Sequence, residues 1–570
     1  MTPKKNHFID DTLLIITMAV LAACGLIYEY LLSHYAGRVL GVMESTIYAM
    51  IGLMIVAMGL GAFAARTIKC AFNGFVILEL IIALIGCCSI LIIGGFIAVT
   101  QILPHIISDT FSLPPDALPQ GGLFKALNFL AFNSPYFFGF LLGFFIGMEI
   151  PLIARIREEI HQKHLNNNLG TIYGADYIGA GIGAAIWVIY LLTLDISKAA
   201  ALTAVLNLTA GSIFVYRYWP RLYWRKTIVC LHIFLVLIVI IIFNYGNQWL
   251  NTMSNVLYLD QVVYSEKTRY QQLTFTQRYM GGSEGKVINF YLNGRLQFSS
   301  SDEDIYHSYL VSPVLAGSAR QKNILIIGGG DGLALRDVLA WSPEKVTLID
   351  LDSQLLDLFT SPTYQTALTK VPDVLAKHIE GLNGKSLQDP RVNVIKGDAF
   401  LEINALLKNK EVFDAIIVDL PDPSHPDLNK LYSVNFYARL NQLLSGDGLM
   451  AIQSTSPYHA KDSFISIGKT VKAANFTQVQ QYHDNVPSFG EWGWTIAAKM
   501  GASPLQRLAS LPALPVKHAW LNIEMIKAAF IFPTHFYLNE KNIGINYLGS
   551  HTLYQLHQNA WRDQQGLLSQ

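Results

Sequence analysis

The chain has 570 residues, of which 52% are hydrophobic and only 14% are charged. Soluble globular chains carry about 25% charged residues, so this composition argues against a protein that is soluble along its whole length. The 41 basic and 41 acidic residues cancel, and a chain with no net charge lacks the global basic surface that nucleic acid requires. We therefore expect a large lipid-embedded part and no nucleic-acid partner.

Seven apolar stretches in the first half are long enough to cross a bilayer, which takes about 20 residues each. They lie at 12–32, 45–65, 73–100, 134–154, 171–194, 198–216 and 227–246. Residues 1–250 are therefore predicted to form a multi-pass helical membrane domain, and 100–133 could hold a short extra segment. No obvious cleavage site follows Lys4 and Lys5, so the first stretch is interpreted as a membrane helix rather than a signal peptide.

The loops between these stretches differ in positive charge. One set carries most of the lysines and arginines, namely Lys4, Lys5, Arg66, Lys69, Arg155, Arg157, Lys163, Arg217, Arg221, Arg225 and Lys226. The other set carries only Arg38, Lys125 and Lys198. The positive-inside rule makes the first set cytoplasmic, which with seven helices would put the remaining chain outside. The chemistry predicted below uses cytosolic metabolites, so we nevertheless expect a multi-pass protein of the cell (inner) membrane with a cytoplasmic catalytic domain.

Four carboxylic acids lie within the apolar stretches: Glu29, Glu79, Glu149 and Asp176. A carboxylate inside a membrane is costly and is by default a functional hypothesis. Two alternatives stay open here: structural pairing or placement at the membrane interface, and the binding of a cation such as a polyamine.

All five cysteines also lie in the first half: Cys24, Cys70, Cys87, Cys88 and Cys230. None has the spacing of zinc ligands or of a disulfide framework, so we interpret them as small buried hydrophobic residues. No metal site is expected.

From about residue 255 charged residues return and short apolar runs alternate with helix-like stretches. The runs lie at 287–292, 323–327, 345–349, 392–395, 415–418 and 449–452. This alternation predicts a doubly wound, Rossmann-like α/β domain of the methyltransferase type over 321–504. A small β-hairpin subdomain is expected before it, over 255–320, and a cap or appendage after it, over 505–570.

The end of the first predicted parallel strand carries a glycine-rich turn, Gly328-Gly-Gly-Asp-Gly332. Glycine allows a tight turn and lets a ligand approach the backbone, and Asp350, about 20 residues on, is placed to accept ribose hydroxyl hydrogen bonds. The next two strands end at Asp398 and at Asp419. Ligands bind at this carboxyl edge in such sheets, so we expect the site there.

Five carboxylates would crowd that edge: Asp331, Asp350, Asp398, Asp419 and Asp422. Such crowding favours a cationic ligand over a phosphate and raises the pKa of at least one member. Beside Asp331, the carboxylate of ordinary S-adenosylmethionine would be repelled, whereas a decarboxylated sulfonium with a primary ammonium would find a partner.

The segment from Tyr270 to Trp494, about 40% of the chain, resembles the spermidine synthase family, the polyamine aminopropyltransferases. The motifs that carry the resemblance are Tyr270-Gln271, Leu292-Asn-Gly-Arg-Leu-Gln297, Asp302-Glu303 with Tyr306-His307, Gly328–Gly332, Asp389-Pro-Arg391, Gly397-Asp398, Asp419-Leu-Pro-Asp422 with Pro426, and Leu431-Tyr432. The whole chain is similar to the membrane-anchored branch of that family.

The resemblance implies an aminopropyl donor site. Gln271 would contact the nucleoside or methylthio end, Asp350 the ribose and Asp398 the adenine. Gly328 and Gly330 would form the turn, and Ala399 and Pro426 would border the adenine. Asp398 could alternatively only cap a helix.

It also implies an amine acceptor site. Asp331 would hold the donor's ammonium, while His307, Asp419 and Asp422 would line the acceptor site, with Asp419 as the proton acceptor. A structural histidine at 307 and a simple turn at Asp422 stay open as alternatives. Where the family has a tyrosine-bearing loop, this chain reads Val486–Trp494, and Glu491 is expected to hold the amine instead.

The implied reaction moves an aminopropyl group from decarboxylated S-adenosylmethionine, a co-substrate, to putrescine or a similar amine. No cofactor and no metal are expected, and the family often forms homodimers. Two alternatives remain: a methyltransferase dependent on S-adenosylmethionine, and a polyamine transporter or sensor whose second half only binds.

Overall fold

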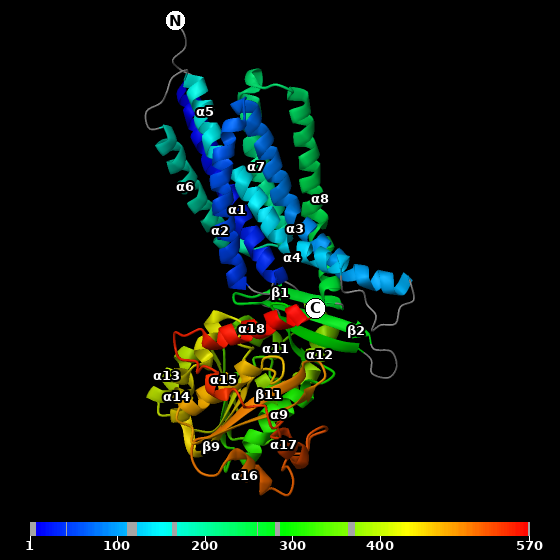
Figure 1. Ribbon diagram of the computed structural model, residues 1–570, viewed down its shortest axis with the longest axis vertical. Coiled ribbons are helices and arrows are strands. Elements are labelled where there is room, and N and C mark those ends of the chain that lie inside the picture. Colours follow the sequence, from blue (N-terminus) through cyan, green and yellow to red (C-terminus); the bar gives the residue numbers. More distant parts are fainter. Residues whose placement is uncertain are drawn as a thin grey trace. The chain divides into compact units, whose positions relative to one another are not determined.

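The computed structural model describes residues 7–40, 43–110, 122–161, 168–258, 260–279, 286–362 and 371–567. Over these residues the chain forms two compact units, Met1–Gln261 and Val262–Gln570 (Figure 1). The first unit is helical and the second is α/β. Each unit is described by itself.

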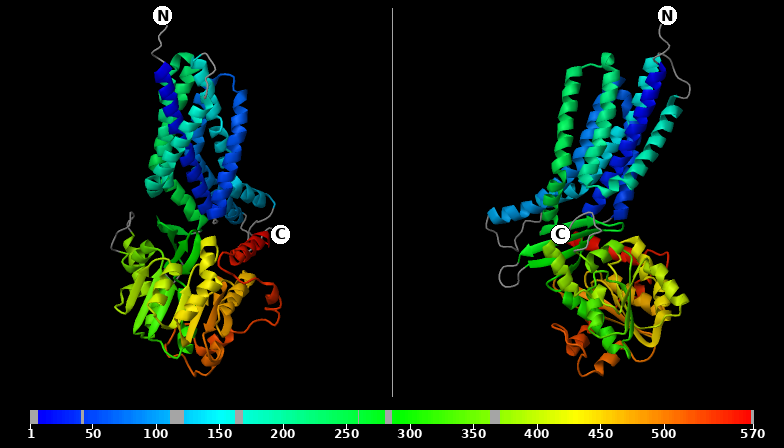
Figure 2. Two further views of the ribbon diagram at one scale, coloured as in Figure 1. Left: turned by 90° about the vertical axis from the view of Figure 1, so that its left-hand side faces the viewer. Right: turned by 180° about the vertical axis from the view of Figure 1, so that it is seen from behind.

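The helical unit consists of eight α-helices within its described residues. They are α1 (His7–Leu40), α2 (Met43–Ala64), α3 (Ala71–Thr110), α4 (Leu123–Ile146), α5 (Glu149–His161), α6 (Asn168–Ile189), α7 (Ile196–Arg217) and α8 (Arg225–Leu257). Because α4 and α5 follow each other as one apolar stretch, the described residues contain seven segments that are long and apolar enough to cross a membrane. The long helices run alongside one another (Figure 2), as the apolar stretches predict.

From the sequence, residues 100–133 could hold a short extra segment. Helix α3 continues through Pro104 to Thr110, and residues from 123 onward begin α4. The described parts of this segment therefore extend the neighbouring helices, and residues 111–121 lie outside the described ones. Close packing within the unit depends on small residues: a Cβ at Gly179 of α6 would lie 2.0 Å from the carbonyl oxygen of Ala19 in α1.

The α/β unit begins with a four-stranded antiparallel sheet. Its strands are β1 (Gln261–Lys267), β2 (Gln272–Tyr279), β3 (Lys286–Leu292) and β4 (Arg295–Ser299), in that order. The expected β-hairpin subdomain is thus present as a four-stranded antiparallel sheet. Phe275, Phe290 and Phe298 on its inner face surround Phe359 of helix α11 (Ser353–Thr360), with ring centroids 5.4 to 6.2 Å away. These contacts join the small sheet to the larger one.

The larger sheet has seven strands in the order β10-β11-β9-β8-β5-β6-β7. They are β5 (Asn323–Gly328), β6 (Lys345–Asp350), β7 (Val392–Lys396), β8 (Phe413–Asp419), β9 (Leu444–Gln453), β10 (Gln478–Val486) and β11 (Gly490–Ala498). The first five in chain order are parallel, while β10 and β11 form an antiparallel hairpin at one edge. The Rossmann-like prediction is confirmed, and the segment from Val486 to Trp494 is the tight turn of this hairpin together with the start of β11.

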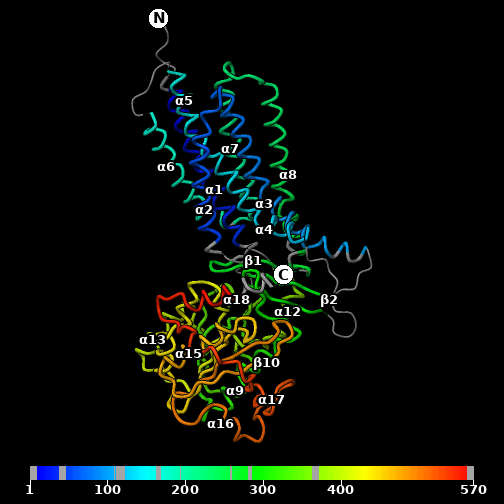
Figure 3. The backbone as a smooth tube through the Cα atoms, in the orientation of Figure 1, coloured from blue at the N-terminus to red at the C-terminus, as the bar shows by residue number. Residues whose placement is uncertain are grey.

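Helices cover both faces of this sheet, and the course of the backbone between them can be followed in Figure 3. Alternate residues of β5 divide between two cores: Ile324 and Ile326 pack with α9 (Glu303–Gly317) and α10 (Leu333–Leu339), and Leu325 and Ile327 pack on the other face. The second face is covered by α13 (Ala399–Lys408), α14 (Val434–Leu443) and α15 (Lys461–Ala473). A fully buried parallel strand is apolar on both sides for this reason.

The last segment, expected as a cap or appendage, is built into the α/β unit. It contains α16 (Pro504–Ala509), α17 (Ile523–Ala529) and α18 (Thr552–Leu567). His518 and Ser312 of α9 are hydrogen-bonded at 2.7 Å, and Asn546 donates to the carbonyl oxygens of Asn429 and Tyr432 at 3.0 and 3.1 Å. These contacts tie the segment to both faces of the sheet.

Candidate active site

The carboxyl ends of β5 and β8 lie side by side, and Gly328 is in register with Asp419. The amide of Gly329 donates to the carbonyl oxygen of Asp419 at 3.1 Å. Gly328 has φ +80°, and a Cβ there would lie 2.0 Å from that same oxygen, so only glycine fits. This is the point where the strand order reverses, which is where ligands bind in open α/β sheets.

Asp419, the last residue of β8, is held by a tyrosine from α9. The Tyr306 hydroxyl donates to Asp419 Oδ1 at 2.8 Å. Burial raises the pKa of Asp419, and the nearby His307 and the Tyr306 hydrogen bond offset only part of that effect. A carboxylate with a raised pKa is suited to accept a proton.

His307 lies one residue further along α9 and is buried. Its Nδ1 donates to the carbonyl oxygen of Glu303 at 2.7 Å and lies 3.0 Å from Glu303 Oε2. Burial lowers the pKa of His307, but the Glu303 carboxylate outweighs burial and brings the pKa to about 9. Glu303 is in turn bound by Arg336 of α10 at 2.7 Å. His307 is therefore an imidazolium at neutral pH and partly neutralises Asp331 and Asp419.

Asp331 and Asp350 flank the glycine turn. Burial raises the pKa of Asp331 to about 6, although its Oδ1 accepts from the amide of Leu333 at 2.9 Å. Burial likewise raises the pKa of Asp350 to about 7, and its oxygens accept from the amides of Gly330 and Asp352 at 3.1 and 2.9 Å. Like charges so close disfavour ionisation unless a cation binds.

Gln271, from the turn between β1 and β2, reaches the same edge. Its Nε2 donates to Asp352 Oδ2 at 3.0 Å, and the Thr268 hydroxyl donates to the same oxygen at 2.6 Å. Asp352 also caps α11. Asp352 and Thr268 were missed at the sequence level, although Asp352 follows Asp350 by two residues and could have been found from that spacing.

Asp398 caps a helix and forms an ion pair. It caps α13 by accepting from the amide of Phe400 at 2.9 Å, and Lys430 lies 2.6 Å from its other oxygen. Ala399 is the first residue of α13, and Pro426 begins the 3-10 helix η6 (Pro426–Tyr432) that carries Lys430. The capping alternative is thus present in the geometry, and contact with adenine stays a prediction.

Asp422 is held by residues that no motif indicated. His557 Nε2 of α18 lies 3.4 Å from Asp422 Oδ2, and Gln453 Nε2 donates to Oδ1 at 3.2 Å. Burial raises the pKa of Asp422, but His557, Gln453 and the charge of Arg295 together lower it. Since His557 lies 135 residues from Asp422 in sequence, no local pattern could have linked them.

Glu491 points away from these groups. It pairs with His483 of β10 at 3.1 Å, on the face of β11 opposite to Trp492 and Trp494. The hairpin instead presents aromatic rings to Tyr306, whose ring centroid lies 6.0 Å from Phe489 and 5.8 Å from Trp494. Amine binding by Glu491 stays a prediction that this geometry does not favour.

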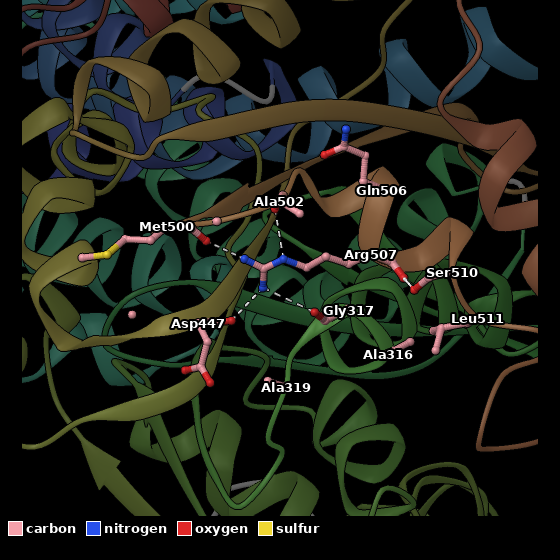
Figure 4. A pocket seen from close by; sticks show the side chains of 12 residues that line it. Ala316, Gly317, Ala319, Asp447, Met500, Ala502, Gln506, Arg507, Ser510 and Leu511 are labelled. Atoms are coloured by element: carbon pink, nitrogen blue, oxygen red, sulfur yellow. Dashed lines mark hydrogen bonds between the residues drawn. The ribbon is translucent and has the colours of Figure 1, made fainter.

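A surface hollow of about 730 Å³ lies at the other edge of the sheet, between the end of α9, the start of β9 and α16 (Figure 4). Its one arginine, Arg507, donates to the carbonyl oxygens of Asp447, Met500 and Ala502 at 2.6 to 3.0 Å. Since that guanidinium already binds the backbone, the hollow is a structural junction. No group of three metal-ligating side chains occurs among the described residues.

A glycine turn and carboxylates at a topological switch point are typical of a nucleoside-binding site in a Rossmann-like sheet. Residues 303–507 match the spermine/spermidine synthase domain. The polyamine aminopropyltransferase of Shewanella oneidensis is 55% identical over 99% of this chain and 97% of its own length. Polyamine aminopropyltransferase 1 of Streptomyces coelicolor is 32% identical over 93% and 92%. This chain belongs to the polyamine aminopropyltransferase family.

Membership of this family confirms the expected enzyme class, an aminopropyltransferase. A solved structure, "Crystal Structure of Spermidine Synthase in Complex with Transition State Analogue AdoDATO", is also similar, at 23% identity and a TM-score of 0.42, over 49% of this chain and 88% of that one.

Proposed function

We propose that the site moves the aminopropyl group of decarboxylated S-adenosylmethionine to putrescine or a similar amine, giving a spermidine-like product and methylthioadenosine. The observation that carries the proposal is the Tyr306–Asp419 hydrogen bond of 2.8 Å at the switch point, with Asp331 close by. A carboxylate held in one orientation beside a second carboxylate is suited to two cationic substrates.

The donor would lie along the ends of β5, β6 and β7. Gly328 and Gly330 would let it approach the backbone, and Asp350 and Asp398 would hold the ribose and the adenine. Asp331 would pair with the aminopropyl ammonium. The same carboxylate disfavours the alternative methyltransferase, since ordinary S-adenosylmethionine carries a carboxylate that Asp331 would repel.

The transfer needs a free amine, because the lone pair of an ammonium is occupied by a proton. Asp419 would accept that proton, and the amine nitrogen would then form a bond to the aminopropyl carbon as the carbon–sulfur bond breaks. The electron pair of the broken bond returns to sulfur, so methylthioadenosine leaves uncharged. Neither a cofactor nor a metal is required to balance this step.

We also infer that the helical unit spans the cell (inner) membrane and that the catalytic unit is cytoplasmic. Seven apolar segments support insertion, and the donor is a cytosolic metabolite. The loop charges favour the opposite orientation. A reporter protein fused after Gln570 tests on which side of the membrane the catalytic unit lies. If only a reporter that works in the periplasm were active, this orientation would be overturned. The expected homodimer remains a prediction.

The purified full-length enzyme with an Asp419→Asn exchange tests the catalytic role. We expect kcat for methylthioadenosine release to fall about 100-fold or more, since general-base contributions have this size. Calorimetry should show nearly unchanged donor binding. Asp427→Asn, on an exposed side chain of η6, is the matched control. Wild-type turnover of Asp419→Asn, or transfer of a methyl group instead, would refute the proposal.

A further inference from the structure

The helical unit buries a cluster of polar side chains that the reaction does not use. Glu79 of α3, Glu149 of α5 and Asn207 of α7 are each 1% exposed, and His232 of α8 is 9% exposed. They come from four different helices. Burying carboxyl groups inside a bundle of apolar helices is energetically costly unless other groups compensate them.

Most oxygen atoms of this cluster have no hydrogen-bond partner among the described residues. They are both carboxyl oxygens of Glu149, Oε1 of Glu79 and Oδ1 of Asn207. Only Glu79 Oε2 is satisfied, because Asn207 Nδ2 donates to it at 3.1 Å. These unsatisfied atoms can all accept hydrogen bonds, and a group that brings several donors would satisfy them.

His232 adds a nitrogen to the same set. Its Nδ1 lies 2.9 Å from the carbonyl oxygen of Ile228 and must donate to it, since a carbonyl only accepts. Nε2 of the neutral ring is then a further acceptor, and it has no partner. A Cβ at Gly211 would lie 3.5 Å from this Nε2 and 3.8 Å from Glu79 Cβ, so the glycine leaves space between them.

The two glutamates belong to one cluster. Glu149 lies within electrostatic range of Glu79, and Cys24 of α1 lies within range of both. The hydroxyl of Tyr28, which also lacks a partner, lies within range of Glu79. No ion pair of either glutamate occurs among the described residues, so no cationic side chain among them compensates the two buried carboxyl groups.

We propose that this cluster is a second cation site, which binds the primary ammonium group of an amine. A primary ammonium brings one positive charge and three N–H donors, which matches carboxylate oxygens, an amide oxygen and an imidazole nitrogen. An alkali ion prefers oxygen ligands throughout and would leave His232 unused. The site goes beyond the proposed reaction, because it lies wholly in the unit without catalytic residues.

Polyamines carry such ammonium groups, so the probe is radiolabelled spermidine in equilibrium dialysis with the full-length protein in detergent. We expect the wild type to bind about two spermidine molecules per chain, and Glu149→Gln to bind about one. Methylthioadenosine release should stay within about twofold of wild type, which reports that the protein is folded. Glu159→Gln, an exposed position on α5, should keep both sites.

Gly211→Ala provides a second test that preserves every polar group and suits a helix. Its methyl group enters the space beside His232 and should weaken the second site about tenfold, or about 1.4 kcal/mol. An Asp419→Asn/Asp422→Asn protein should retain the Glu149-dependent site, so failure of the proposed reaction would be distinguishable. The inference would be overturned if Glu149→Gln bound as many spermidine molecules per chain as the wild type. It would also be overturned if sodium ions occupied the site and spermidine did not bind there.

Discussion

The imidazole of His557 lies 3.4 Å from the carboxylate of Asp422, although the two residues are 135 positions apart in the sequence. Residue 557 falls outside the matched synthase domain, which ends at 507. The C-terminal segment is attached there by Asn546, which donates to the carbonyl oxygens of Asn429 and Tyr432, and by Leu553, which is fully buried. The C-terminal segment thus contributes to the environment of a predicted amine-binding residue.

Replacing His557 by alanine should therefore affect the acceptor more than the donor. Asp422 would lose a hydrogen-bonding partner that orients it, and a buried hydrogen bond to a charged group contributes about 1.5 kcal/mol. We expect KM for the amine to rise about tenfold while KM for the donor changes less than about twofold. Steady-state kinetics with each substrate varied provides the measurement, with Asn559→Ala on the exposed side of α18 as the control. An equal rise in both constants would argue for a purely structural histidine.

Replacing Tyr306 by phenylalanine removes the hydroxyl that donates to Asp419. That hydrogen bond counteracts burial, so its loss should raise the pKa of Asp419 further. The acidic limb of the kcat profile should move to higher pH, and kcat at neutral pH should fall about tenfold. A pH profile of the variant measures both effects. A lower kcat with an unshifted limb would contradict this role for the hydroxyl.

Donor binding should weaken as the pH falls. The pKa of Asp350 is raised to about 7 and that of Asp331 to about 6, so both lose their charge as protons are added across this range. A cationic donor then loses its partners, and its dissociation constant should rise at least tenfold between about pH 8 and pH 5.5. Calorimetry without the amine measures this constant. A flat profile would show that these carboxyl groups do not face the donor.

Exchanging Asp331 for asparagine should stabilise the folded protein but weaken its interaction with the donor. A carboxyl whose folded pKa lies above its unfolded value contributes stability at low pH, and this is lost as pH rises from about 4 to about 6. Asparagine avoids that loss and can still accept from the Leu333 amide. At pH 8 we expect the free energy of unfolding to rise by about 1 to 2 kcal/mol, and the donor KM to rise as well. Denaturant titrations at pH 8 and pH 4 measure it, and an equal gain at both values would contradict the charge argument.

The parallel part of the α/β unit was predictable from the sequence because each element carries its own signal. Strand β5 is a buried apolar run that ends in Gly328, and β8 ends in Asp419, so their neighbouring ends follow from the rules of parallel sheets. The hairpin of β10 and β11 was harder to predict from the sequence. Its residues contact α9 on one face and α15 on the other, so no simple alternation of apolar and polar residues appears.

The sequence by itself determined the chemistry and the class of fold, because glycine turns, strand-end carboxylates and long apolar stretches act over short distances along the chain. Only the tertiary structure decided which charged and polar side chains lie next to one another. It turned Glu491 toward His483, brought His557 to Asp422, and gathered Glu79 and Glu149 from separate helices. Such pairings depend on how distant segments pack, and burial then sets their energy far more than their spacing in sequence does.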